Sequence, residues 1–193
     1  MALPKQIPTY APEDYLALER LIDERHEYLD GIVYLMAGES LNHSRICINL
    51  AREVSNQLKG RDCEALSSNM KVCADSHGLF AYPDLTVVCG KPRFLDEQRD
   101  VLLNPTVIFE VLSPSTAAYD RGEKFQRYSA QIETLQDYVL IAQDTPHVEL
   151  RSRQPDGTWS RAEVSELTAT LELTSIDCHL PLAEIYDRIE FTE

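Results

Sequence analysis

The run TVIFEVL, residues 106–112, constrains the fold most, because apolar residues surround a single carboxylate in it. Such a run predicts a central strand that is buried on both faces. An isolated ionised carboxylate in those surroundings costs several kcal/mol unless a cation or strong donors compensate it. We therefore expect a positive group beside Glu110. Two ordinary alternatives stay open: a buried salt bridge, or a glutamate at the exit of the strand that backbone donors cap.

A second carboxylate, Asp84, lies in the run PDLTVV. Alternation along a strand places it on the same face as Thr86 and Val88. A strand this apolar disfavours an aspartate for the same reason as the first strand disfavours its glutamate. The two carboxylates are therefore expected to converge on one cation.

Four further positions are candidates for the same site. Lys124 and Tyr128 lie four residues apart on the helix predicted after Glu110, so they share one helix face. Glu27 begins a predicted hairpin, and His43 opens a long predicted helix. The ordinary interpretations are a solvated helix lysine, a surface glutamate and a satisfied interior histidine.

The order of the predicted elements indicates an α/β or α+β fold, a mixed β-sheet flanked by helices with additional antiparallel hairpins. Asn42 is the predicted N-cap of the long helix, and residues 91–104 form a charged, exposed excursion. The predicted elements are a helix over 12–22, a hairpin over 26–36 around Asp30-Gly31, a helix over 42–59, strands over 70–74, 82–90 and 106–112, a helix over 120–132, a strand over 135–142, a hairpin over 148–164 and a short helix over 181–188. With 193 residues and no repeat or linker, the chain is expected to form one domain over 1–193.

Composition narrows the class of protein. The net charge of −14 argues against a non-specific nucleic-acid coat, which needs a broad basic surface, but it leaves a nuclease with a local metal site possible. The five cysteines are odd in number and form no C-x-x-C pair, which favours buried thiols over a disulfide framework or a zinc knuckle. Neither a signal-like apolar stretch nor a membrane span is found, so we expect a cytoplasmic protein.

The motifs YPDLTVV, TVIFEVLSPST, YDRGEKFQRY and LQDYVLI together resemble the Uma2-type family, long catalogued as a domain of unknown function, within the PD-(D/E)XK restriction-endonuclease-like superfamily. The resemblance implies a four-stranded mixed core sheet flanked by helices. Asp84 would match the motif aspartate, Glu110 the acidic residue of the (D/E)-x-K element, and Glu27 the glutamate near the N-terminus of many members. Leu112 stands where the pattern expects lysine, and Lys124 is the candidate for a lysine moved to the next helix.

These residues favour a metal-dependent endonuclease that hydrolyses phosphodiester bonds, with DNA as the expected substrate. Asp84, Glu110 and the carbonyl of Val111 form an oxygen-only site suited to Mg²⁺ or Mn²⁺. Lys124 would position or deprotonate the attacking water, and Glu27 could complete a second metal shell. Tyr128 would fix the lysine. A homodimer is expected, because related nucleases pair to cut both strands.

The main rival is a catalytically inactive nuclease fold that binds nucleic acid or protein. The acidic charge and Leu112 favour it, and the retained charges of Asp84, Glu110 and Lys124 oppose it. A serine hydrolase is disfavoured because no G-x-S-x-G motif occurs. No glycine-rich phosphate loop is present either, so no nucleotide cofactor is expected.

Overall fold

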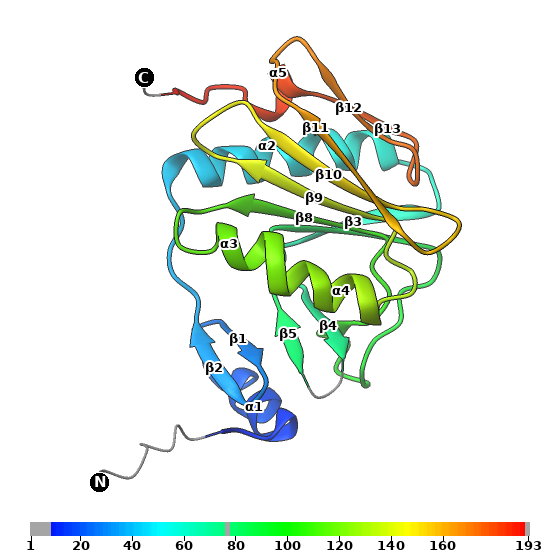
Figure 1. Ribbon diagram of the computed structural model, residues 1–193. Coiled ribbons are helices and arrows are strands. Elements are labelled where there is room, and N and C mark those ends of the chain that lie inside the picture. The colour runs from blue at the N-terminus through cyan, green and yellow to red at the C-terminus, as the bar shows by residue number, and fades with distance from the viewer. Residues whose placement is uncertain (1–8, 76–77, 192–193) are drawn as a thin grey trace, which may run out of the picture.

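The computed structural model describes residues 9–75 and 78–191, and a six-stranded mixed sheet forms its centre (Figure 1). The strand order is β11-β10-β9-β8-β6-β3. The strands are β3 (Cys63–Ser67), β6 (Leu85–Cys89), β8 (Val107–Leu112), β9 (Asp137–Ala142), β10 (Val148–Arg153) and β11 (Trp159–Val164). Strands β8 and β9 are parallel, and the other pairs are antiparallel. All six residues of β8 are buried, which confirms the predicted central strand.

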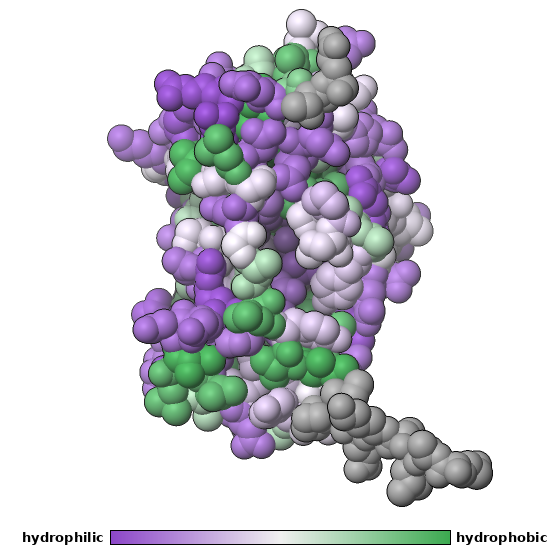
Figure 2. Space-filling view, turned by 90° about the vertical axis from the view of Figure 1, so that its left-hand side faces the viewer, coloured by the Kyte–Doolittle hydropathy of each residue, from purple (hydrophilic) through white to green (hydrophobic). Residues whose placement is uncertain are grey.

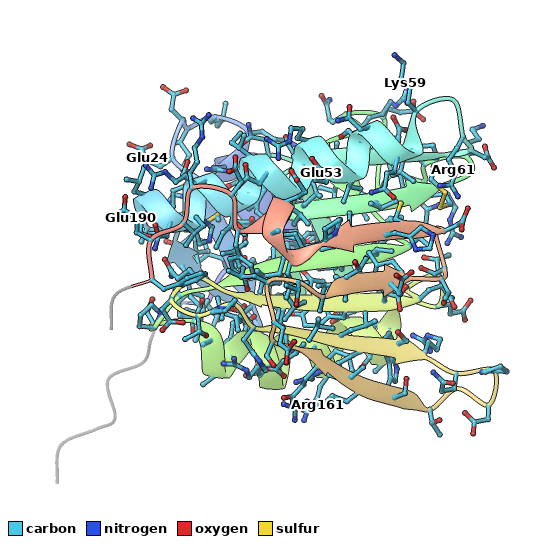
Figure 3. The ribbon with its side chains drawn as sticks, turned by 90° about the horizontal axis from the view of Figure 1, so that it is seen from above. Glu24, Glu53, Lys59, Arg61, Arg161 and Glu190 are labelled. Atoms are coloured by element: carbon cyan, nitrogen blue, oxygen red, sulfur yellow. A yellow bond between two sulfur atoms is a disulfide. The ribbon has the colours of Figure 1, made fainter. Side chains whose placement is uncertain are left out.

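Helix α2 (Leu41–Leu58) covers one face of this sheet. Its apolar stripe, which includes Ile46, Leu50 and Val54, packs in one core with Val87 and Phe109. The short helix α5 (Leu182–Ile185) and the hairpin of β12 (Thr170–Leu173) and β13 (Cys178–Pro181) contribute to the same core. Seen from above, α2 runs over the strands toward Lys59 and Arg61 (Figure 3).

The opposite face carries the continuous helical segment α3 (Ala117–Tyr119), η1 (Asp120–Lys124) and α4 (Phe125–Gln131), in which η1 is one π-helical turn. Tyr128 of α4 packs there against Ile108, Tyr138 and Leu140. Val72, Ala74, Leu79 and Ala81 of the second sheet join this core, so the two sheets share one apolar layer.

The second sheet has the strand order β2-β1-β5-β4-β7 and lies below the large sheet in Figure 1. It consists of β1 (His26–Leu29), β2 (Ile32–Leu35), β4 (Lys71–Asp75), β5 (Leu79–Ala81) and β7 (Val101–Leu102), with α1 (Pro12–Glu19) packed against it. The predicted hairpin is confirmed. Asp30 and Gly31 both have positive φ, as a type I′ turn requires.

Several predicted boundaries are wrong. Ser40, and not Asn42, caps α2, because its side chain accepts a hydrogen bond from the His43 backbone N–H. The predicted exposed excursion contains β7, whose two residues are buried, and the buried side chain of Asn104. The strand predicted over 82–90 begins only at Leu85, so Asp84 stands immediately before it.

The cysteine prediction is also wrong for one pair. Cys63 and Cys89 form a disulfide, because β3 pairs with β6 in a register that sets the two residues opposite each other, with 4.0 Å between their Cα atoms. The sequence did not predict β3, so this cross-strand proximity was not visible. Cys47, Cys73 and Cys178 carry free thiols.

None of the helices in the described ranges combines the length and the apolar character that crossing a membrane requires.

Candidate metal-dependent active site

Asp84 and Glu110 stand opposite each other at the start of β6. The β6–β8 ladder ends with the pair Leu85 and Phe109, so the next antiparallel position sets residue 84 against residue 110. Alternation then directs both side chains to the sheet face that η1 and α4 cover. The two carboxylates therefore lie on one sheet face at adjacent strands, and their convergence on a shared cation stays a prediction.

Asp84 is held by two groups. Its Oδ2 accepts a 2.7 Å hydrogen bond from the Val111 backbone N–H and lies 3.4 Å from Nε2 of His43. Burial lowers the pKa of His43, but Asp84 and Glu39 raise it more, so its pKa lies above the ordinary value. A residue in a strand directs its N–H and its C=O to the same side. The Val111 carbonyl therefore points to the same side as its N–H, toward Asp84 and the segment that precedes β6.

Lys124 occupies the centre of an acidic cluster. Its Nζ lies 2.9 Å from Glu110, 3.3 Å from Glu27 and 3.6 Å from Asp120. The lysine side chain is only 4% exposed. It comes from η1, Glu27 comes from β1 and Glu110 from β8, so the cluster joins both sheets and the helix. The structure thus brings Lys124 and Glu27 to the residues that the sequence assigned to the site.

The cluster carries excess negative charge. The carboxylates of Glu27, Glu110 and Asp120 surround the ammonium of Lys124, and Asp84, which acts on Glu110, adds a fourth. Three negative charges remain if all four are ionised and His43 is neutral. A divalent cation would reduce this to one. The Glu110–Lys124 contact is the buried salt bridge that the ordinary interpretation allowed, but one lysine cannot balance four carboxylates. The donor set therefore fits a hard divalent cation.

The pKa values reflect this imbalance. Burial raises the pKa of Glu110 well above its usual range, against the opposing effect of Lys124. Burial also raises the pKa of Asp120. For Lys124, burial lowers the pKa, but Glu110 and Glu27 raise it more, so the ammonium stays charged. Without a further cation, the carboxyl groups of Glu110 and Asp120 therefore hold protons more tightly than free ones do.

Tyr128 is fully buried beside this cluster, one helical turn after Lys124. Burial raises its pKa, so the hydroxyl stays neutral. Among the described residues, none hydrogen-bonds to this hydroxyl. The position suits a residue that packs the lysine stem in place.

The cluster lies at the base of a cleft with a volume of about 1290 Å³. The cleft opens on the side of the molecule that Figure 2 shows, where hydrophilic side chains prevail in the upper part and hydrophobic ones gather toward the lower end. Seven acidic side chains line it, against the two basic side chains of Arg25 and Lys124 and the imidazole of His43. The acidic lining residues are Glu27, Glu39, Asp84, Glu110, Asp120, Glu123 and Asp144.

The sequence assigned no role to Asp120, Glu39 or Cys47. Asp120 stands four residues before Lys124, a spacing that places both on one helix face and could have revealed the contact. Glu39 and Cys47 have the same spacing on either side of His43 and contact its Nδ1. Cys47 was interpreted only as part of the apolar stripe of the helix.

The mixed sheet, with helices on both faces, and the carboxylate pair beside a lysine define a protein of the restriction-endonuclease-like class. The chain belongs to the Uma2 family, described as "Putative restriction endonuclease", whose family model matches residues 12–183. This confirms the resemblance that the motifs indicated.

Two relatives and one solved structure agree with this membership. Two uncharacterized proteins of Synechocystis are 38% and 33% identical; the alignments cover 95% of both chains for the first, and 83% of this chain and 90% of the relative for the second. The crystal structure of a "putative nuclease" from Anabaena variabilis has a TM-score of 0.73 at 17% identity, covering 94% of this chain and 99% of that chain. The last likeness shows the fold.

Proposed function

We propose that this protein is an endonuclease that hydrolyses phosphodiester bonds in DNA with Mg²⁺ or Mn²⁺. One observation carries the proposal: Asp84 and Glu110 face each other across two strands, and Lys124 lies 2.9 Å from Glu110 at the base of an open cleft. The family and the solved relative support nuclease chemistry at a coarser level.

Each residue of the cluster has a distinct part. Asp84, Glu110 and the carbonyl of Val111 would hold the cation, which supplies a bound water of lowered pKa and positive charge against the phosphate. Lys124 donates hydrogen bonds to the attacking water or to the phosphate oxygens. Glu27 keeps that ammonium charged and in place. Tyr128 packs against the lysine stem.

The rival, an inactive fold that binds nucleic acid or protein, makes a different prediction. With seven acidic and two basic lining residues, the cleft itself repels a phosphate backbone. The proposal therefore predicts that DNA binding requires a divalent cation, and Ca²⁺ can test this without cleavage. DNA binding that is equally tight in EDTA would favour the rival.

A cleavage screen tests the proposal directly. Single-stranded and double-stranded DNA and RNA are incubated with Mg²⁺ or Mn²⁺ and with wild type, Asp84→Asn or Glu110→Gln. We expect each substitution to lower the cleavage rate by about 100-fold or more, the scale of losing one preorganised electrostatic group. Glu166→Gln, an exposed carboxylate after β11 that is absent from the cleft lining, is the matched control. Wild-type activity in Asp84→Asn or Glu110→Gln would contradict the assigned roles.

The homodimer and the cytoplasmic location stay predictions. Two paired copies would let each site cut one strand of a duplex. Light scattering of the purified protein measures the oligomeric state, and a monomer at the concentration at which duplex DNA is cut would oppose the pairing.

A further inference from the structure

Glu39, His43 and Cys47 form a second cluster of metal-ligating side chains at the start of α2. His43 and Cys47 lie one turn apart on one face of α2, and Glu39 stands just before the N-cap Ser40, four residues ahead of His43. One ligand atom from each lies within 4.8 Å of the other two. Glu39 and His43 line the same cleft as the carboxylates around Lys124, whereas Cys47 does not, so the cluster adjoins that site through the contact of His43 with Asp84.

The distances are close to those of a tetrahedral metal site. Nδ1 of His43 lies 3.0 Å from the Glu39 carboxylate and 3.4 Å from Sγ of Cys47. Around Zn²⁺, with ordinary metal–ligand bonds, neighbouring N, O and S ligands are about 3.4 to 3.6 Å apart. Shifts of a few tenths of an ångström would bring the two contacts of His43 to that spacing, and the Glu39 oxygen and Sγ of Cys47 lie within 4.8 Å of each other. The half-exposed Glu39 side chain leaves the site open to water for the fourth position.

The other nitrogen of His43 also has the partner that a metal-binding histidine needs. Nε2 lies 3.4 Å from Oδ2 of Asp84. Histidine ligands commonly donate their second ring N–H to a carboxylate, which fixes the tautomer and the ring orientation. With Nε2 protonated toward Asp84, Nδ1 carries its lone pair toward Glu39 and Cys47.

We propose that Glu39, His43 and Cys47 bind a borderline or soft divalent cation such as Zn²⁺. Thiolate and imidazole ligands select Zn²⁺ over Mg²⁺, whereas the oxygen-only set of Asp84 and Glu110 favours the harder ion. Burial, Asp84 and Glu39 raise the pKa of the Cys47 thiol, so a bound cation would have to displace its proton. The resulting thiolate and the Glu39 carboxylate would then offset the positive end of the helix dipole. The site stands independently of nuclease activity.

Cobalt absorption spectroscopy tests this proposal, because a thiolate bound to Co²⁺ gives a charge-transfer band that oxygen ligands do not give. The full-length protein with its disulfide intact is stripped of metal and titrated with Co²⁺ in the absence of nucleic acid. We expect one equivalent to produce the band in wild type and in Cys178→Ser, a matched free cysteine in the core. Cys47→Ser should abolish the band, and His43→Gln should weaken Co²⁺ binding by at least about tenfold.

Glu110→Gln separates this site from the proposed catalytic one, because Glu110 contacts Lys124 and does not belong to the cluster of Glu39, His43 and Cys47. At saturating Co²⁺, the variant should keep the band even if nuclease activity is lost. A band that disappears in Glu110→Gln would place the ion among the catalytic carboxylates and overturn a separate site. A wild type without the band, or a band of equal strength in Cys47→Ser, would also overturn the proposal. Circular dichroism of each variant confirms that the comparison is made on folded protein.

Discussion

Lys124 reaches the carboxylates from a helix, whereas the motif places its lysine on the strand two residues after the glutamate. Leu112 occupies that strand position and is buried in the apolar layer with Tyr128 and Tyr138. The ammonium of Lys124 nevertheless lies 2.9 Å from Glu110. A lysine ammonium is therefore present at the site, but a helix supplies it instead of the strand.

Replacing this lysine should destabilise the metal-free protein strongly. Lys124→Met removes the only ammonium within 4 Å of Glu110 among the described residues and leaves that carboxyl buried without a counter-charge. We expect the free energy of unfolding to fall by about 3 kcal/mol, the scale of breaking a buried ion pair. Urea unfolding in EDTA measures this loss. Lys59→Met, at an exposed position at the C-terminal end of α2, is the control and should change stability little. A loss as small as that of the control would show that Lys124 does not neutralise the cluster.

The site residues differ in how far the sequence could predict them. Asp84 and Glu110 were predictable because an ionised group in an apolar strand is costly and needs an explanation. Lys124 was predictable from the resemblance and from its distance along the chain. Asp120 was not assigned, because an acidic residue in a first helical turn has an ordinary role in capping. Cys47 looked like any small apolar residue of the stripe.

At the scale of elements, α1 is tied to the segment before β7 by Arg20, which forms ion pairs with Asp96 and Asp100. The hydrogen bond from Arg20 holds the pKa of Asp100 below its ordinary value of 3.8. A folded-state pKa below the unfolded one adds stability above pH 3.8, and this stability is lost as the pH falls through the folded pKa.

Asp100→Asn tests this contribution. Because the pair is partly exposed, we expect the substitution to cost less than about 1 kcal/mol at pH 7. The difference from wild type should shrink as the pH falls below 3.8. Denaturant unfolding of both proteins at several pH values gives the curve. A difference that stays constant down to pH 2 would mean that ionisation of Asp100 is not its source.

The disulfide between β3 and β6 gives a second prediction at this scale. It closes a loop between residues separated by 26 positions. Loop-closure entropy alone gives such a crosslink about 3 kcal/mol of stabilisation, part of which native-state strain can offset. Thermal unfolding with and without a reductant should show a lower melting temperature when the bond is reduced. Cys63→Ser should melt at the lower temperature in both conditions. Equal melting of the wild type with and without reductant would contradict a stabilising bond.

The elements that the sequence predicted are those with strong periodicity or strong turn residues. The long amphipathic helix, the buried central strand and the Asp30-Gly31 hairpin belong to this group. The missed strands are β3, β5, β7, β12 and β13, and their local signals are weak: β3 reads CEALS, and β5 and β7 have three and two residues. The strand conformation of β3, β5 and β7 comes from pairing with other strands, which a local pattern does not contain.

At the scale of the whole molecule, the site depends on contacts between both sheets. Glu27 comes from the small sheet and Glu110 from the large sheet. Lys124 comes from the helical segment that packs in the apolar layer shared by the two sheets. This arrangement supports the prediction that residues 1–193 form one domain, which stays a prediction. Because the protein carries a net charge of −14, a bound cation would offset the repulsion between the protein and a phosphate backbone.

Calorimetric titration with Mn²⁺ tests the central claim most directly. Wild type and Cys47→Ser should both bind Mn²⁺ at the oxygen site. Asp84→Asn and Glu110→Gln should lose that binding, with affinity lowered by at least about tenfold. If wild type binds no Mn²⁺, or if both carboxylate variants bind it as tightly as wild type, then Asp84 and Glu110 do not hold a shared cation.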